Sequence, residues 1–397
     1  MSARILILTA GFGEGHNAAA RALAAACDAQ GGPGTARVVD AFALAAPRID
    51  AIARWIYRLL ITRAPGLWSL FYRWLDRSSW AERLMDLLAG ERRVLDRILR
   101  EERPEFICST YPVYAFLLQG LGAAGRPLPP HYNVVTDSIS INSLWWRAGA
   151  AGWFVPNADS ADVMIAAGVD RTRIHVLGFP VTDYFLRHGA QLGPGEISAA
   201  SPPRVLCIVN AGTPAAADMA RRLLTDTDWE VTCTVGRNAA IEKELSQLAG
   251  ARRPVTRILG WTDRVPHLLL THHVVLSKAG GATTQEALAA RCPMIVNQIV
   301  PGQEEGNYEL LRRHGIGALA ETPAAMLGTL DRAFANEGAV WRQWRTALAA
   351  LSRPGAAGAI AEFLLGPAAR TPAEPEPVPM PFRPEREARP APQEARA

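Results

Sequence analysis

The sequence predicts an α/β fold with two Rossmann-like domains and an interdomain cleft. Short apolar segments alternate with helical spacers in two separate series, which is typical of parallel sheets covered by helices. A stretch rich in Gly, Pro and Ser separates the two series. A chain of 397 residues is also long for a single hydrophobic core. We therefore expect an N-terminal domain over 1–188, a linker over 189–203, a C-terminal domain over 204–366 and a Pro-rich, disordered tail over 367–397.

The apolar runs give the expected strands in order. The first series is expected at 4–10, 38–39, 105–109, 132–136, 152–155 and 174–177, and the second at 204–209, 231–235, 256–259, 274–276 and 294–297. The first strand runs into a glycine loop over 11–15 and then an Ala-rich helix over 17–30. Ala19, Leu23 and Ala26 fall on one face of that helix, as a buried helix face requires.

Composition excludes several classes of protein. A net charge of only +4 does not indicate a nucleic-acid binder. The five cysteines are scattered without a C-x-x-C pair, which argues against a disulfide framework or a metal site and fits a reducing compartment. Residues 1–10 resemble a first strand more than a signal peptide, and we find no membrane-spanning stretch. We expect a cytoplasmic protein that is peripheral to a membrane.

The most informative segment runs from Lys278 to Glu286, where a strand ends in glycines and a helix begins. Such a helix start offers free backbone N–H groups to a diphosphate. Glu286 can accept hydrogen bonds from sugar hydroxyls, although most glutamates simply lie in solvent. A second segment, 301–307, carries Gln303, Glu304 and Asn307 on a Pro-Gly loop. These side chains suit a hexose, and ordinary turn chemistry is the alternative.

His16 is the sharpest catalytic candidate. It follows a glycine loop at the start of a helix, and a helix N-terminus disfavours the charged imidazolium. A neutral His16 can accept the proton of an acceptor hydroxyl. The alternatives are a capping role or a hydrogen bond to a diphosphate oxygen.

The three motifs together resemble a known family. G-G-x-T-x-x-E at 280–286, P-G-Q-E-x-x-N at 301–307 and Gly13-Glu14-Gly15-His16 are similar to those of monogalactosyldiacylglycerol synthases, processive diacylglycerol glucosyltransferases and, more distantly, the muramyl-lipid N-acetylglucosaminyltransferase. The resemblance covers about residues 4–365 and implies a GT-B fold with the site between the domains. It places His16 in the active site, with Gly13 and Gly15 in the loop beside phosphate and acceptor. It implies that Gly280, Gly281, Thr283, Glu286, Gln303, Glu304 and Asn307 bind the donor.

Three further features each allow two interpretations. Asp137 follows a predicted strand and is a second candidate for the base, or a turn or N-cap residue. The family usually has a His between the T-D pair and a Trp, but 138–144 contains none. Gly212 and Thr213 form either a phosphate nest or an ordinary βα turn. By resemblance Trp261 borders the uracil, and a core Trp is the alternative.

Residues 47–80 have a composition unlike the rest of the chain, with seven aromatic residues, six arginines and only two acids. Basic side chains beside Trp-rich apolar surface are typical of helices that bind a membrane interface. The candidate membrane residues are Arg54, Trp55, Arg58, Trp68 and Arg73. The alternative is a helical hairpin packed on its own domain.

We therefore expect an inverting glycosyltransferase that moves a hexose from a UDP-sugar to a lipid such as diacylglycerol, at an anionic membrane surface on the inner face of the cell membrane. The expected partners are the UDP-sugar and the lipid acceptor, with no nucleic acid. We expect no cofactor and no metal, because no D-x-D motif appears in a metal-binding context. The alternatives are a UDP-sugar epimerase or hydrolase on the same fold, and a non-catalytic nucleotide-sugar sensor.

Overall fold

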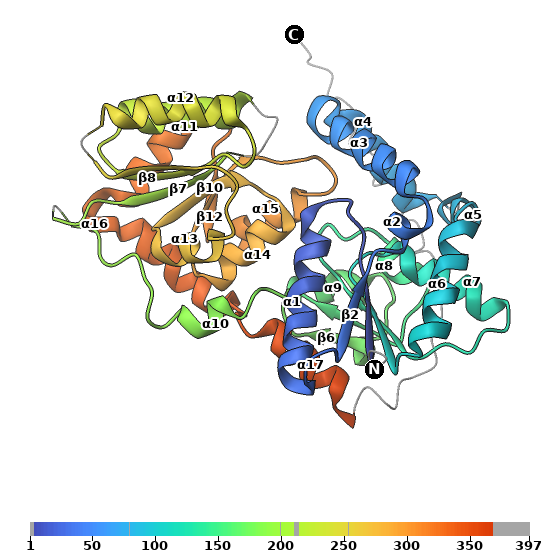
Figure 1. Cartoon of the computed structure of the whole chain (residues 1–397). Coiled ribbons are helices and arrows are strands. Elements are labelled where there is room, and N and C mark those ends of the chain that lie inside the picture. Colours follow the sequence, from blue (N-terminus) through green and yellow to red (C-terminus); the bar gives the residue numbers. More distant parts are fainter. Residues whose placement is uncertain (1–3, 79, 199, 210–213, 253, 368–397) are drawn as a thin grey trace, which may run out of the picture.

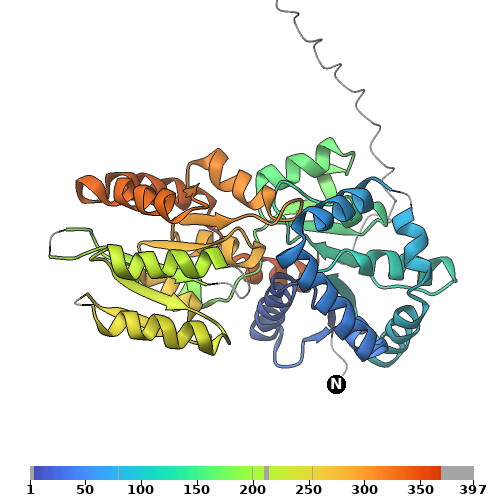
Figure 2. The same cartoon turned by 90° about the horizontal axis from the view of Figure 1, so that it is seen from above.

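The computed structural model describes residues 4–78, 80–198, 200–209, 214–252 and 254–367. Two domains lie side by side, each with a six-stranded parallel sheet between helices (Figures 1 and 2). The first sheet has the order β2-β1-β3-β4-β5-β6. Its strands are β1 (Ile5–Leu8), β2 (Ala36–Val39), β3 (Phe106–Ser109), β4 (His131–Val134), β5 (Gly152–Val155) and β6 (Ile174–Val176). Each expected strand of the first series is present, and no strand end is shifted by more than two residues.

The second sheet has the order β12-β11-β10-β7-β8-β9. Its strands are β7 (Arg204–Ile208), β8 (Glu230–Thr234), β9 (Thr256–Leu259), β10 (Val274–Lys278), β11 (Met294–Gln298) and β12 (Gly317–Leu319). The sequence predicted the first five but missed β12. This edge strand has three half-buried residues and no apolar run, so it carries no periodic signal.

Helices cover both sheets. They are α1 (Glu14–Gly31), α2 (Ala41–Ala45), α3 (Pro47–Arg63), α4 (Pro65–Arg77), α5 (Trp80–Asp86), α6 (Ala89–Glu102), α7 (Val113–Ala123), α8 (Leu144–Arg147), α9 (Ala158–Ala166), α10 (Tyr184–His188), α11 (Pro214–Asp226), α12 (Ala239–Gly250), α13 (Val265–Thr271), α14 (Gly281–Ala289), α15 (Glu305–His314), α16 (Pro323–Leu351) and α17 (Ala356–Leu365). A 3₁₀ turn spans Arg171–Arg173.

The strand orders indicate which edge of each sheet suits ligand binding. In the first sheet the chain leaves β1 toward β2 on one side and returns to β3 on the other, and in the second β7 stands between β8 and β10. Ligands in such sheets bind beyond the carboxyl ends of the strands at this reversal. These ends lead into α1 and α14, whose starts meet, since a β-carbon at Gly15 would lie 3.7 Å from the backbone nitrogen of Ala282.

The domain boundary at the C-terminus differs from the expected one. Helix α17 falls in the range assigned to the second domain, but it packs on α1 of the first (Figure 1). Ile360 and Leu364 join the core formed by Ile5, Ile7 and Leu23. The apolar pattern of α17 indicates burial but not which domain buries it, so only the tertiary structure could assign it. The Pro-rich tail lies outside the described residues.

One described segment, Pro323–Leu365, is long and apolar enough to cross a membrane by length and composition. It comprises α16 and α17. Met326, Leu330 and Trp341 of α16 belong to the core of the second domain, and Ile360 of α17 to that of the first. These contacts account for the apolar composition of both helices.

Candidate active site

His16 is the third residue of α1, whose start meets the start of α14 in the second domain. Its Nδ1 lies 2.6 Å from the carbonyl oxygen of Thr110 and 3.1 Å from Oγ1 of Thr136. A carbonyl can only accept a hydrogen bond, so Nδ1 carries the proton and Nε2 keeps a free lone pair. This arrangement leaves Nε2 as the atom that can accept a proton.

The surroundings of His16 keep the imidazole neutral. Burial lowers its pKa to about 4, against the opposing effect of the hydrogen bond to Thr110. The ring of Tyr111 meets the imidazole edge to face, with centroids 5.2 Å apart. No sequence pattern selects Thr110 or Tyr111, since both owe their place to the adjacency of β1 and β3.

Asp137 lies three residues beyond β4. Its Oδ2 accepts a 2.8 Å hydrogen bond from Nε1 of Trp145. Burial raises the pKa of Asp137 to about 6, and the indole hydrogen bond opposes the rise. The next helix, α8, has Ser143 at its N-cap, so Asp137 is not a helix cap. A buried carboxyl with a pKa near neutrality suits a general base, and Asp137 stays a candidate beside His16.

The start of α14 lies against the start of α1. Gly280 is the N-cap of α14, and no side chain caps the first turn. A β-carbon at Gly281 would lie 3.3 Å from the carbonyl oxygen of Thr136 in the other domain, so a small residue is needed here. Thr283 lies half-buried in the same turn. The open helix start agrees with the predicted diphosphate seat.

Glu286 lies farther along α14 and faces α1. Burial raises its pKa to about 7, nearby Glu14 raises it further, and Arg21 opposes the rise. Burial has therefore removed water from this carboxyl group without supplying a cation that pairs with it. Its oxygens can accept hydrogen bonds from the hydroxyls of a ligand. The half-buried position excludes the alternative of a fully solvated glutamate.

The loop over 301–307 gives its three predicted sugar residues different surroundings. Gln303 is half-buried, and its Oε1 accepts a 3.1 Å hydrogen bond from the hydroxyl of Tyr57 in α3. Asn307 donates through Nδ2 to the carbonyl of Ala279 at 2.9 Å, while its buried Oδ1 has no protein partner. Asn307 therefore supports the glycine turn directly.

Both carboxylate oxygens of Glu304 already have protein partners. One oxygen pairs with Nζ of Lys278, and the other accepts the backbone N–H of Val300 at 3.0 Å. Its side chain is only 6% exposed. Glu304 therefore anchors the loop and Lys278, a cation beside Gly280, and its contact with the sugar stays a prediction.

Trp261 is 69% exposed, so the alternative of a core Trp is wrong. It follows the carboxyl end of β9, as Gly280 follows the carboxyl end of β10, and its exposed ring can contact a ligand. Gly212 and Thr213 lie outside the described residues. Gly13 precedes α1 with φ of 109°, a conformation that favours glycine, and Gly15 lies in the first turn.

Two of the five predicted membrane residues do not lie on the outer face of the α3–α4 hairpin. Arg54 is paired with Asp40 at 2.6 Å and with buried Asp50 at 2.7 Å, and its guanidinium lies over Gly11. It anchors α3 and does not face outward. Trp68 is half-buried, with its ring edge to face with Tyr57 at 5.0 Å.

The outer face of the hairpin is apolar and exposed. In α3, Ile52, Trp55, Ile56 and Leu59 share one helix face and are 58%, 57%, 44% and 37% exposed. Leu67, Leu70, Phe71 and Trp74 repeat this spacing on α4 and are also exposed. Arg58 and Arg73 are exposed on the same two helices. The alternative of a hairpin wholly packed on its own domain is therefore wrong for this face.

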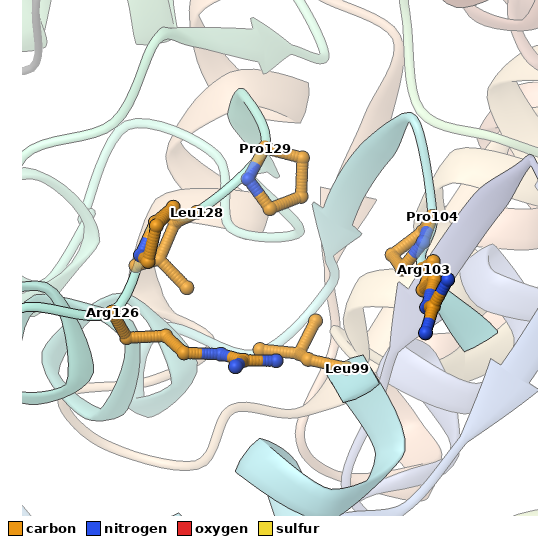
Figure 3. A pocket seen from close by; sticks show the side chains of 7 residues that line it. Leu99, Arg103, Pro104, Arg126, Leu128 and Pro129 are labelled. Atoms are coloured by element: carbon orange, nitrogen blue, oxygen red, sulfur yellow. The ribbon is translucent and has the colours of Figure 1, made fainter. Parts of the chain in front are cut away.

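Other described regions add no second centre. Within the described ranges no group of three or more His, Cys, Asp or Glu side chains could hold a metal ion. A groove of about 400 Å³ lies between Leu99, Arg103, Pro104 and the segment 126–129 (Figure 3). Pro104 and Pro129 come just before β3 and β4, so this groove is at the amino ends of the strands, opposite the cleft edge.

Comparison with known proteins agrees with these motifs. Residues 16–181 match the sequence model of the monogalactosyldiacylglycerol (MGDG) synthase family. A processive diacylglycerol beta-glucosyltransferase of Bacillus cytotoxicus is 26% identical over 373 residues, which cover 91% of this chain and 93% of that protein. A protein of the same name from Bacillus mycoides is 25% identical over 390 residues, which cover 95% of this chain and 96% of that protein.

Solved structures support the fold. The UDP-GlcNAc 2-epimerase of Neisseria meningitidis superposes with a TM-score of 0.58 and 13% identity, over 91% of this chain and 99% of that one. CalG4, the calicheamicin glycosyltransferase, superposes with a TM-score of 0.56 and 13% sequence identity, over 93% of this chain and 100% of that one. At these identities the likeness concerns the fold alone. With the family match over residues 16–181 and similar proteins along nine-tenths of the chain, this protein is similar to the monogalactosyldiacylglycerol synthase family and has the two-domain GT-B fold.

Proposed function

We propose that this protein is an inverting glycosyltransferase that moves a hexose from a UDP-sugar to the hydroxyl of a lipid such as diacylglycerol. The observation that carries the proposal is the arrangement of the cleft. His16, with Nε2 free, lies on one wall, and the uncapped start of α14 with Glu286 forms the other. The activity for which the relatives are named, diacylglycerol glucosyl transfer, supports this chemistry.

The proposed reaction is a single displacement. The acceptor oxygen bonds to the anomeric carbon of the hexose from the face opposite UDP, and the bond from that carbon to the diphosphate oxygen breaks. UDP leaves with the electron pair, and the acceptor proton passes to the enzyme base. We assign the base to Nε2 of His16, which the Nδ1–H···O bond to Thr110 orients. Asp137 is the competing candidate.

The donor is held by the second domain in this proposal. The backbone N–H groups at the start of α14 bind the diphosphate as negative charge grows on the leaving group. Glu286 accepts hydrogen bonds from the ribose hydroxyls, Gln303 contacts the hexose, and Trp261 borders the uracil. Lys278, beside the glycine turn, adds positive charge to this part of the cleft.

The acceptor is lipid, and we place the reaction at an anionic membrane surface on the cytoplasmic face. The support is the α3–α4 hairpin, with an apolar stripe on each helix and exposed arginines. A membrane would cover apolar side chains that otherwise lie in water.

One assay tests the proposal against its alternatives. Purified protein is given UDP-glucose, UDP-galactose or UDP-N-acetylglucosamine, with and without diacylglycerol in anionic vesicles. UDP release that requires lipid, with a glycosylated lipid seen by mass spectrometry, supports transfer. Lipid-independent UDP release indicates a hydrolase, a changed sugar an epimerase, and binding without turnover a sensor. Inversion is checked by NMR of the anomeric proton of the product, and retained configuration would contradict it.

A further inference from the structure

The exposed hairpin touches the donor loop of the other domain. Gly302 adopts a left-handed conformation with φ of 86°. A β-carbon there would lie 3.2 Å from Cδ1 of Tyr72 and 3.6 Å from Oγ of Ser69, both in α4. The Pro-Gly turn before Gln303 therefore rests directly on the inner face of the hairpin.

The hairpin is also fixed firmly to its own domain. In α4, Asp76 accepts the backbone N–H of Ser143 at 2.6 Å, and its carbonyl accepts the Ser143 hydroxyl at 2.8 Å. In α3, Arg54 makes the ion pairs with Asp40 and Asp50. The hairpin thus links the first domain rigidly to the loop over 301–304.

Tyr57 lies where these contacts converge. Its hydroxyl lies 3.1 Å from Oε1 of Gln303 and would be 3.7 Å from a β-carbon at Gly13, in the loop that leads to His16. Phe12 and Trp68 pack edge to face against its ring, with centroids 6.1 and 5.0 Å away. Burial raises the pKa of Tyr57 to about 12, so the neutral hydroxyl donates to Gln303 at physiological pH.

We infer that Tyr57 is a positioning residue for the donor hexose: its hydroxyl holds Gln303 and so ties the placement of the sugar loop to the α3–α4 hairpin. The amide of Gln303 keeps its two N–H donors for the sugar while its oxygen is held by Tyr57. The inference rests on the proposed function, because it assumes a UDP-hexose in this cleft.

The test compares the affinity for the UDP-hexose with the affinity for UDP alone. Tyr57→Phe removes one hydroxyl and keeps the ring packing. Because Gln303 faces the hexose and Glu286 the ribose, this variant should bind the UDP-hexose about 3- to 10-fold more weakly, while its affinity for UDP alone stays within about twofold. Calorimetry with UDP and with UDP-glucose, UDP-galactose and UDP-N-acetylglucosamine measures both. Donor KM should rise with kcat at saturating donor near the wild-type value.

Tyr184→Phe is the matched control, since it removes a hydroxyl bonded at the same 3.1 Å to His267, beside the interdomain linker. It should change neither affinity. In a Gln303→Leu background, Tyr57→Phe should add no further loss, because the two residues act as one unit.

Equal losses for UDP and UDP-hexose, no loss at all, or fully additive losses in the double variant would each overturn the role of Tyr57. Wild-type protein that binds none of the three UDP-hexoses contradicts the proposed function itself, before any variant is compared.

Discussion

Trp145 and Asp137 are joined by a 2.8 Å hydrogen bond from the indole Nε1 to Oδ2 of the carboxylate. The tryptophan is itself held fast, because its carbonyl accepts Nε1 of Trp153 at 2.7 Å and Nδ2 of Asn133 at 3.1 Å. The ring of His16 lies 6.4 Å from that of Trp145. One buried indole therefore fixes the position of Asp137 and lies near His16.

Trp145→Phe should move the acidic limb of kcat/KM to higher pH if Asp137 is the base. The indole hydrogen bond favours the charged carboxylate, so its loss raises the pKa of Asp137 above the value of about 6. A pH–rate profile on a soluble acceptor measures the limb. An unmoved limb lying near pH 4 would instead point to His16, whose pKa is about 4.

His16→Ala should lower turnover at least about 100-fold while UDP still binds, because loss of a general base acts on the transition state. Turnover is measured with saturating donor, and UDP affinity by calorimetry. Asp137→Asn serves as the comparison. If His16→Ala keeps near wild-type turnover and Asp137→Asn does not, the assignment of the base moves to Asp137.

Glu286→Ala should weaken UDP-sugar binding by about 1.5–3 kcal/mol, the cost of losing hydrogen bonds to a charged group. Calorimetry with UDP and the donor measures the loss. Unchanged affinity in a folded variant would remove Glu286 from the ribose site.

Glu286→Gln should stabilise the unliganded protein at alkaline pH. Between the ordinary carboxyl pKa of 4.5 and the folded value of about 7, the native state keeps a proton that the unfolded chain has lost, so stability falls as pH rises through this window. Above it the charged carboxylate costs about 1–3 kcal/mol, which the amide avoids. Melting should show a higher Tm for the variant at pH 8 and little difference at pH 5. An equal difference in Tm at pH 5 and pH 8 would contradict the titration of Glu286 as its cause.

Arg58→Gln with Arg73→Gln should weaken binding to anionic vesicles by about 1 kcal/mol for each arginine, and added salt should mimic the change. Arg222→Gln with Arg332→Gln, on exposed positions of the second domain, is the control for net charge. Trp55→Ser should weaken binding with little salt dependence, because it removes apolar contact. Vesicle sedimentation measures all three. Wild-type protein that ignores anionic vesicles at low salt would refute the membrane role.

Arg54→Gln should behave differently from these surface variants. It leaves buried Asp50 without its ion pair and should lower stability by about 1–3 kcal/mol, since an unpaired buried charge is costly. The comparison is the Tm of this variant against that of Arg58→Gln, which should melt like the wild type. Equal melting temperatures would show that the Arg54 ion pairs add no stability.

The sequence alone determined the two α/β sheets, eleven of the twelve strands that the described residues form, and the glycine turns before α1 and α14, because strand periodicity and turn chemistry are local properties. It also selected His16 and Glu286, whose places at glycine-led helix starts are visible in the chain order. The motifs were sufficient for the family resemblance, since each lies within one continuous segment.

The tertiary structure decided what depends on distant partners. The sequence could not show that Thr110 fixes the tautomer of His16, that Glu304 pairs with Lys278, or that α17 returns to the first domain. On composition alone, Arg54 and Arg58 looked alike at one helical turn apart, but one is held by two carboxylates and the other is exposed. The physical reason is that hydrogen bonding, pairing and desolvation of a polar side chain are set by residues that only folding brings beside it.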